Sequence, residues 1–273
     1  MNLPKNKNRG FSLIEMAVVM LIMGSLLSGL LVALTQTSNN TRITTAKTQM
    51  LKIEEALYAF AQAHGRLPCP ATYDSGGYEN PNDGSGNCTQ PHGFVPSASL
   101  SLYSRINDDR LMLDPWSNPY RYSIAPYEVD TSGNWQAEGG GEYAFTDKNR
   151  LQELFNNQNM NSELGFNPGE NSSTLRICTS YQCSPGEDIS TLAPAIVLSM
   201  GPNWTNMIDD CGVTTNTDEV ENAGASSDVG GYCLTSTNTF VDTEFNEENF
   251  DDIIIWLSPY ILFSRLIDAQ QLP

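Results

Sequence analysis

The stretch Gly10-Phe11-Ser12-Leu13-Ile14-Glu15 opens an apolar run that continues to Leu34. From Phe11 to Leu34 the run is 24 residues long, and Glu15 is its only charged residue. About 20 apolar residues in a helix are enough to cross a bilayer. The run therefore predicts one membrane-spanning helix, in which an unpaired carboxylate would cost about 3 kcal/mol.

The ten residues before this run are basic. Lys5, Lys7 and Arg9 lie there without any acid. Positive flanks of this kind stay in the cytoplasm, so we expect the rest of the chain to lie on the outer side of the membrane. An ordinary secretory signal has a shorter apolar core that ends at a small-residue cleavage site, and this run fits that pattern badly.

Apolar residues continue after Leu34 at spacings of three and four, which predicts an amphipathic helix over residues 35–66 in direct continuation of 11–34. Gly65 and Pro68 should end it. The helix is therefore expected to run from Phe11 to about His64, with its striped half packed on a globular body. The stripe consists of Ile43, Ala46, Met50, Ile53, Leu57, Phe60 and His64.

The remainder, residues 67–273, is rich in Gly, Asn, Pro and Ser with short β-branched runs, which predicts strands separated by long loops. The segment from Ala195 to Asn203 reads as a buried strand that ends in a turn. Ser258-Pro259 then has the form of a helix N-cap followed by proline, and predicts a C-terminal helix.

All six cysteines follow the apolar run, and their even number favours disulfides in an oxidising compartment. If each cysteine pairs with the next one along the sequence, the disulfides are Cys69–Cys88, Cys178–Cys183 and Cys211–Cys233. Zinc is the alternative, but it prefers two closely spaced cysteine pairs. Only Cys178 and Cys183 approach that spacing.

The formal net charge of −18 would become −21 if the basic leader were removed. Nucleic-acid binding uses clustered Lys and Arg, which this chain lacks, so we expect none. An active site needs convergent groups. His64 and His92 stand apart in the sequence, and we expect no catalytic residues and no enzyme activity.

The hexapeptide at Gly10 resembles the processing motif of type IV prepilins, Gly-Phe-Thr-Leu-Ile-Glu, and differs only at Ser12. The resemblance implies that a prepilin peptidase removes residues 1–10 by cleaving between Gly10 and Phe11, and methylates the new N-terminus of Phe11. It also implies that Glu15 meets the N-terminal amine of a neighbouring subunit, which would supply the missing partner.

A second resemblance joins the segment Asp114-Pro115-Trp116-Ser117-Asn118-Pro119-Tyr120 to the Asp-Pro-Trp-Gly-Asn-Pro-Tyr segment of the major pseudopilins of type II secretion. Ser199-Met200-Gly201-Pro202-Asn203 is similar to the calcium loop of that family, and Asp251–Trp256 is similar to its closing strand, which implies a strand there. This implies a calcium site with Ser199, Asn203 and Asp251 as ligands, although Asn203 replaces the usual acid. Asp209 or Asp210 could supply the missing charge. The alternative is a solvated acidic loop without a metal.

These patterns together predict an α+β, pilin-like fold: a long N-terminal helix packed on an antiparallel sheet, with disulfide-stapled loops and a C-terminal helix. The expected function is a structural subunit, a minor pilin or pseudopilin of a type IV pilus or a type II secretion filament. Before assembly it would sit in the bacterial inner membrane, and its partners would be prepilin peptidase and other pilin subunits. The alternative is an anchored or filament-borne adhesin that uses residues 204–249 as its contact surface.

Overall fold

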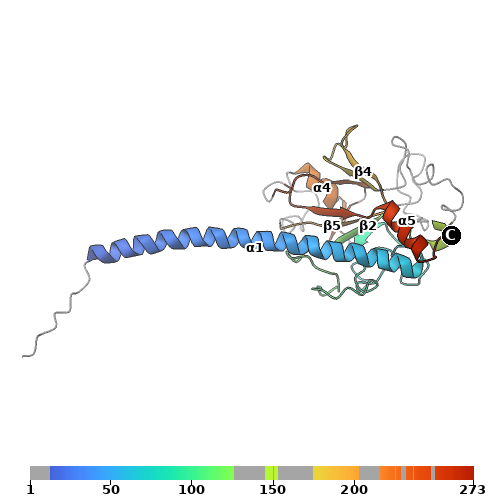
Figure 1. The fold of residues 1–273 in the computed structure, drawn as a ribbon, viewed down its shortest axis with the longest axis horizontal. Helices are drawn as coiled ribbons and strands as arrows, with labels where there is room; N and C mark the ends of the chain where they lie inside the picture. The colour runs from blue at the N-terminus through green and yellow to red at the C-terminus, as the bar shows by residue number, and fades with distance from the viewer. Residues whose placement is uncertain are drawn as a thin grey trace, which may run out of the picture. The chain divides into compact units, whose positions relative to one another are not determined.

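The computed structural model in Figure 1 describes most of the helix and body. The described residues are 13–125, 145–149, 151–152, 175–202, 216–224, 226–228, 232–235, 237–246 and 250–273, without the side chains of 29–37 and 226–228. The chain divides into two compact units, Met1–Thr45 and Ala46–Pro273.

The first element is the long helix α1, Leu13–His64, of 52 residues. In its second half Ala46, Met50, Ile53 and Leu57 are all fully buried. These residues and the buried Phe60 confirm most of the predicted stripe, whereas Ile43 is half-buried and His64 is exposed. The helix stops at the predicted place because Gly65 adopts a φ of +74°, a conformation that favours glycine.

The first half of α1 is different, because the described side chains from residue 13 to residue 28 are all exposed. Among the residues described with their side chains, no helix is both long and apolar enough to cross a membrane. The span predicted for 11–34 lies partly outside them.

The main sheet of the body has the strand order β1-β2-β5-β9, and all its neighbours are antiparallel. Its central strand β5 is buried at every position. Both strands expected from the sequence, β5 and the closing strand β9, are confirmed, and they pair with each other. The strands are β1 (His92–Phe94), β2 (Arg121–Ile124), β5 (Ala195–Ser199) and β9 (Ile253–Trp256).

Aromatic residues of the β2 region join the sheet to α1 and to the loop that follows it. The fully buried Tyr120 donates its hydroxyl to Gln49 Oε1 of α1 at 2.7 Å. Tyr122 Oη donates to the carbonyl of Pro68 at 3.1 Å. Tyr120 therefore joins β2 to α1, and Tyr122 joins it to the loop after the helix.

Two smaller sheets flank the main one. One has the order β4-β3-β8, and the other consists of β6 and β7. The pairing of β3 with β8 is parallel, which departs from the antiparallel sheet expected from sequence. The elements are β3 (Leu175–Cys178), β4 (Asp188–Ala193), α4 (Thr217–Ala223), β6 (Ser226–Asp228), β7 (Cys233–Leu234) and β8 (Thr239–Val241). The class is α+β, as expected.

The predicted C-terminal helix is present as α5, Pro259–Asp268. Ser258 occupies the N-cap position and Pro259 begins the helix, although the Ser258 side chain makes no capping hydrogen bond. The backbone N–H of Ser258 instead donates to Tyr58 Oη of α1 at 3.0 Å. Burial raises the pKa of Tyr58 to about 12, so this phenol stays protonated at neutral pH.

A buried ion pair fixes the loop that leads away from α1. Arg66 donates through both terminal nitrogens to the two carboxylate oxygens of Glu79, each at 2.8 Å. The two side chains are only 5% and 6% exposed. Glu79 Oε2 also accepts from the backbone N–H of Cys69, which forms a disulfide with Cys88. The ion pair and the disulfide therefore meet in one polar cluster.

Candidate functional site

The predicted processing residues Gly10 and Phe11 lie outside the described residues, so cleavage and methylation there stay predictions. Glu15 is described and lies in the first turn of α1 as the structure has it. A carboxylate in that turn interacts favourably with the positive end of the helix dipole.

Glu15 is surrounded along the chain by exposed apolar side chains. Leu13 is 89% exposed, Ile14 72% and Leu21 74%. Contiguous apolar surface of this size marks an interaction site for a protein or a membrane. Between residues 13 and 28 the helix therefore needs an apolar partner, and Glu15 is the one charged group that such a partner must accommodate.

The predicted calcium ligands are only partly brought together. Ser199 is fully buried, and its hydroxyl donates to Asp114 Oδ2 at 2.7 Å. The other oxygen of Asp114 accepts from the backbone N–H groups of Trp116 and Asn118. Asn118 in turn donates its side-chain amide to the carbonyl of Gly201. Burial raises the pKa of Asp114 despite these hydrogen bonds. The network has the structural role of fixing two turns.

The third predicted ligand, Asp251, is fully buried beside Gly201 and belongs to a different group. Glu219 of α4 accepts from the backbone N–H of Asp251 at 3.1 Å. The next residue, Asp252, accepts from the side-chain amide of Asn222 at 2.9 Å. Burial raises the pKa of Asp252 well above its ordinary value, and the neighbouring carboxylates of Glu219 and Asp251 raise it further.

Sequence reasoning missed Glu219 and Asp252, because nothing in their local sequence distinguishes them from solvated acids. Of the remaining predicted ligands, Asn203, Asp209 and Asp210 lie outside the described residues. Calcium binding by Ser199, Asn203 and Asp251 therefore stays a prediction.

The disulfide predictions are confirmed where both cysteines are described. Cys69 is bonded to Cys88, and Cys178 to Cys183. Cys233 is also disulfide-bonded, while its predicted partner Cys211 lies outside the described residues.

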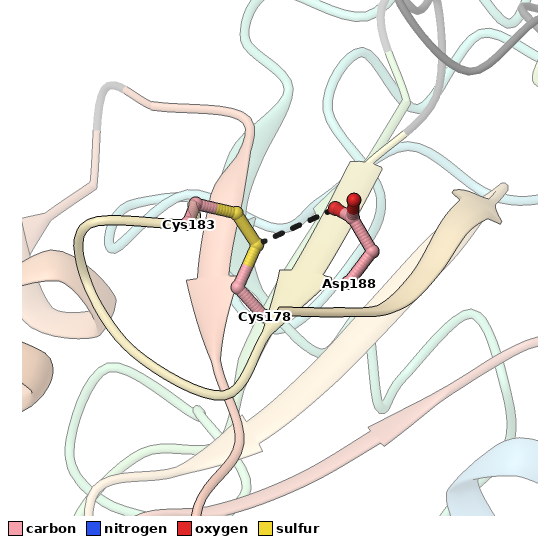
Figure 2. A group of neighbouring side chains, drawn as sticks. All are labelled: Cys178, Cys183 and Asp188. Carbon is pink, nitrogen blue, oxygen red and sulfur yellow. Dashed lines mark hydrogen bonds between the residues drawn. A yellow bond between two sulfur atoms is a disulfide. The ribbon is translucent and has the colours of Figure 1, made fainter. Parts of the chain in front are cut away.

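Figure 2 shows the environment of the shorter disulfide, where Asp188 of β4 points toward Cys178. Cys178 Sγ lies 3.8 Å from Asp188 Oδ1. The three side chains have the proximity of metal ligands. However, cysteine binds a metal ion as a thiolate, and a disulfide offers none. Asp188 is moreover ion-paired with Arg176. The oxidised group has a structural role in closing the turn between β3 and β4.

The two histidines are far from any catalytic arrangement among the described side chains. His64 ends α1 and stacks on Phe60, with ring centroids 4.0 Å apart. His92 is buried in β1, and its Nδ1 lies 2.9 Å from Ser123 Oγ. A cavity of about 10 Å³ beside His92 has room for a water molecule.

Burial of His92 predicts a pH dependence of stability. It lowers the pKa of His92 to about 3, below the ordinary value of 6.5. As the pH falls from 6.5 toward 3, His92 binds a proton in the unfolded chain but stays neutral in the folded chain. The free energy of unfolding should therefore drop, by about 3 kcal/mol between pH 7 and pH 4.5 from this residue alone.

Buried carboxyls with raised pKa values, such as Asp114, have the opposite dependence, so the measurement is a difference between two proteins. Urea unfolding of the wild type and of His92→Gln at both pH values should show a smaller acid-side loss in the variant. Equal losses in the two proteins would refute this role of His92.

Comparison with known proteins bears on the N-terminus. Residues 5–31 match the family model described as the prokaryotic N-terminal methylation motif, which is the cleavage and methylation signal of type IV prepilins. The matched range contains Gly10, Phe11 and Glu15. No curated protein and no solved structure matches the chain.

The motif supports a type IV pilin-like precursor. It implies processing by a prepilin peptidase and assembly with pilin subunits in general. The resemblance stated for the Gly10 hexapeptide is thereby confirmed.

Proposed function

We propose that this chain is a minor pilin or pseudopilin: a low-abundance structural subunit of a type IV pilus or a type II secretion filament. The observation that carries the proposal is the methylation motif at residues 5–31, followed directly by an exposed apolar helix in which Glu15 is the only charge from residue 13 to residue 28. A filament neighbour can cover such a helix and pair its carboxylate.

The proposed life cycle has two stages. The precursor is held in the inner membrane by residues 11–34, with the basic leader in the cytoplasm and the body outside. After cleavage behind Gly10, the same apolar residues move into the filament core. The disulfides fit an extracytoplasmic body, because they persist in oxidising compartments.

Intact-mass analysis of the protein from its native host tests the processing step. With prepilin peptidase present, we expect loss of residues 1–10 and one added methyl group on Phe11. Without the peptidase, the leader should remain. An uncut chain in the presence of the active peptidase would overturn the proposal.

Replacement of Glu15 tests the assembly step. Glu15→Ala removes the carboxylate that would pair with a neighbour's terminal amine, so we expect normal cleavage but loss of incorporation into sheared filaments. Glu55→Ala, which removes an exposed acid from the body half of the same helix, is the matched control. Undiminished incorporation of Glu15→Ala would contradict the assembly role, and surface display without any filament would favour the adhesin.

A further inference from the structure

A short part of α1 consists of residues that form helices poorly. Residues 38–45 read Ser-Asn-Asn-Thr-Arg-Ile-Thr-Thr, and they are called the polar segment, with Ile43 as its one apolar residue. Serine, threonine and asparagine side chains compete for backbone hydrogen bonds, and β-branched side chains lose rotamer freedom in a helix. Arg42 is the only residue of the segment with a high helix propensity. The local sequence therefore gives this part of α1 little stability of its own.

The polar segment is also the part of α1 directly before core packing begins. None of its residues is buried, whereas the next residue, Ala46, is fully buried. The first compact unit of the chain ends at Thr45. Most of the stability of helices in proteins comes from the packing of one face. The polar segment therefore lacks the support that holds α1 from Ala46 onward.

Ion pairs along the helix do not replace that support. The sequence has no acid between Glu15 and Glu54. Arg42 therefore has no carboxylate one helical turn away with which it could form a stabilising pair.

Two threonines of the segment make hydrogen bonds that weaken a helix. Thr44 donates its hydroxyl to the carbonyl of Asn40 at 2.8 Å. Thr45 donates its hydroxyl to the carbonyl of Thr41 at 2.7 Å. Bonds of this kind, to a carbonyl four residues earlier, slightly destabilise helices and often bend them.

We propose that the polar segment is a hinge: its helical hydrogen bonds open while α1 stays helical before and after it. Local openings occur where packing is sparse and backbone hydrogen bonds are exposed. Water can bond the released N–H and C=O groups, because the segment is exposed to solvent. A helix that is polar on most sides, without packing or ion pairs, is not stable by itself.

The consequence of the hinge for assembly rests on the proposed function. During assembly the apolar residues 13–28 leave the membrane and enter the filament, while the body stays outside. A rigid helix would force the body to turn together with these residues. An open hinge lets the two turn separately, so we assign the hinge to this step of transfer.

Native-state proteolysis tests the hinge, because cleavage of a folded protein reports the population of its locally opened form. Trypsin can cleave after Arg42 in the polar segment and after Lys52 in the packed half of the same helix. Both residues are exposed, and each is followed by isoleucine. With the full chain in detergent, we expect cleavage after Arg42 to be at least about tenfold faster than after Lys52. Equal rates at the two sites would overturn the proposal.

Matched substitutions locate the opening. Thr44→Ala raises the helix propensity of the polar segment, so cleavage after Arg42 should slow about threefold. Thr48→Ala makes the same change at another exposed threonine, one turn later in the packed half, and should leave that rate unchanged. Equal slowing by the two variants would place the opening outside the polar segment and refute the hinge.

The variant Thr41→Ala/Thr44→Ala/Thr45→Ala separates the hinge from the proposed function. Cleavage after Arg42 should slow at least about tenfold, and incorporation into sheared filaments should fall by a similar factor with leader removal unchanged. Undiminished incorporation despite slowed cleavage would refute the role of the hinge in assembly. If the wild type itself does not enter filaments, the proposed function fails, whereas the rates at Arg42 and Lys52 still decide whether the hinge exists.

Discussion

Glu79→Gln is expected to lower the free energy of unfolding by about 3–5 kcal/mol. The substitution keeps the shape of the side chain but removes the anion that faces the guanidinium of Arg66. Both partners are almost fully shielded from water, so the remaining charge cannot be solvated. The carbonyl of Leu67 and the ring of Phe60, whose centroid lies 5.3 Å from the guanidinium carbon, compensate only in part.

The matched control is Glu55→Gln, which breaks an ion pair of the same chemistry on the surface. The side chains of Arg265 and Glu55 are 40% and 64% exposed, so water replaces the lost partner. We expect a loss of at most about 1 kcal/mol. Urea unfolding of the soluble body measures both variants, and similar losses for the two would show that burial does not set the strength of the Arg66 pair.

Removal of the Cys69–Cys88 disulfide, as Cys69→Ala/Cys88→Ala, is expected to cost about 3 kcal/mol. The two cysteines are separated by 19 positions in the sequence, and the bond restricts the unfolded chain over that loop. The cost is expected to exceed the entropic figure if the backbone N–H of Cys69, which donates to the Glu79 carboxylate, also loses its alignment.

Cys178→Ala/Cys183→Ala provides the comparison, because those cysteines are only 5 positions apart. The shorter loop predicts a smaller loss, about 2 kcal/mol. Chemical unfolding of both double variants under non-reducing conditions tests the order. A larger loss from the shorter loop would contradict the loop-entropy argument.

The features that could be predicted from sequence depend on residues that lie close together in the chain. The stripe from Ala46 to Leu57 specifies which face of α1 is buried, because helical spacing acts within a few turns. Gly65 marks its end for an equally local reason. The strand β5 and the Ser258-Pro259 helix start also follow from short runs. At the N-terminus, the Gly10 hexapeptide alone was enough to indicate the processing signal that the family model matches.

The features that sequence reasoning missed depend on contacts between distant residues. Arg66 meets Glu79 only after the disulfide loop has folded back, and no spacing rule relates the two. The parallel pairing of β3 with β8 joins segments about sixty positions apart. Glu219, likewise, looks like a solvated helix acid until α4 is placed against Asp251. Predicting such contacts requires the tertiary arrangement first.

The way α5 closes the body also bears on the order in which the chain folds. The N-terminal half of the body is synthesised first, yet the hydroxyl of Tyr58 and the carbonyl of Gln62 accept hydrogen bonds from Ser258 and Gln271, close to the C-terminus. Likewise, the edge of β5 that does not pair with β2 is covered by β9, which comes late in the chain. A chain interrupted anywhere before these last elements would therefore present an open sheet edge and an incompletely covered helix. The last elements to be synthesised, β9 and α5, therefore complete the main sheet and the cover of α1.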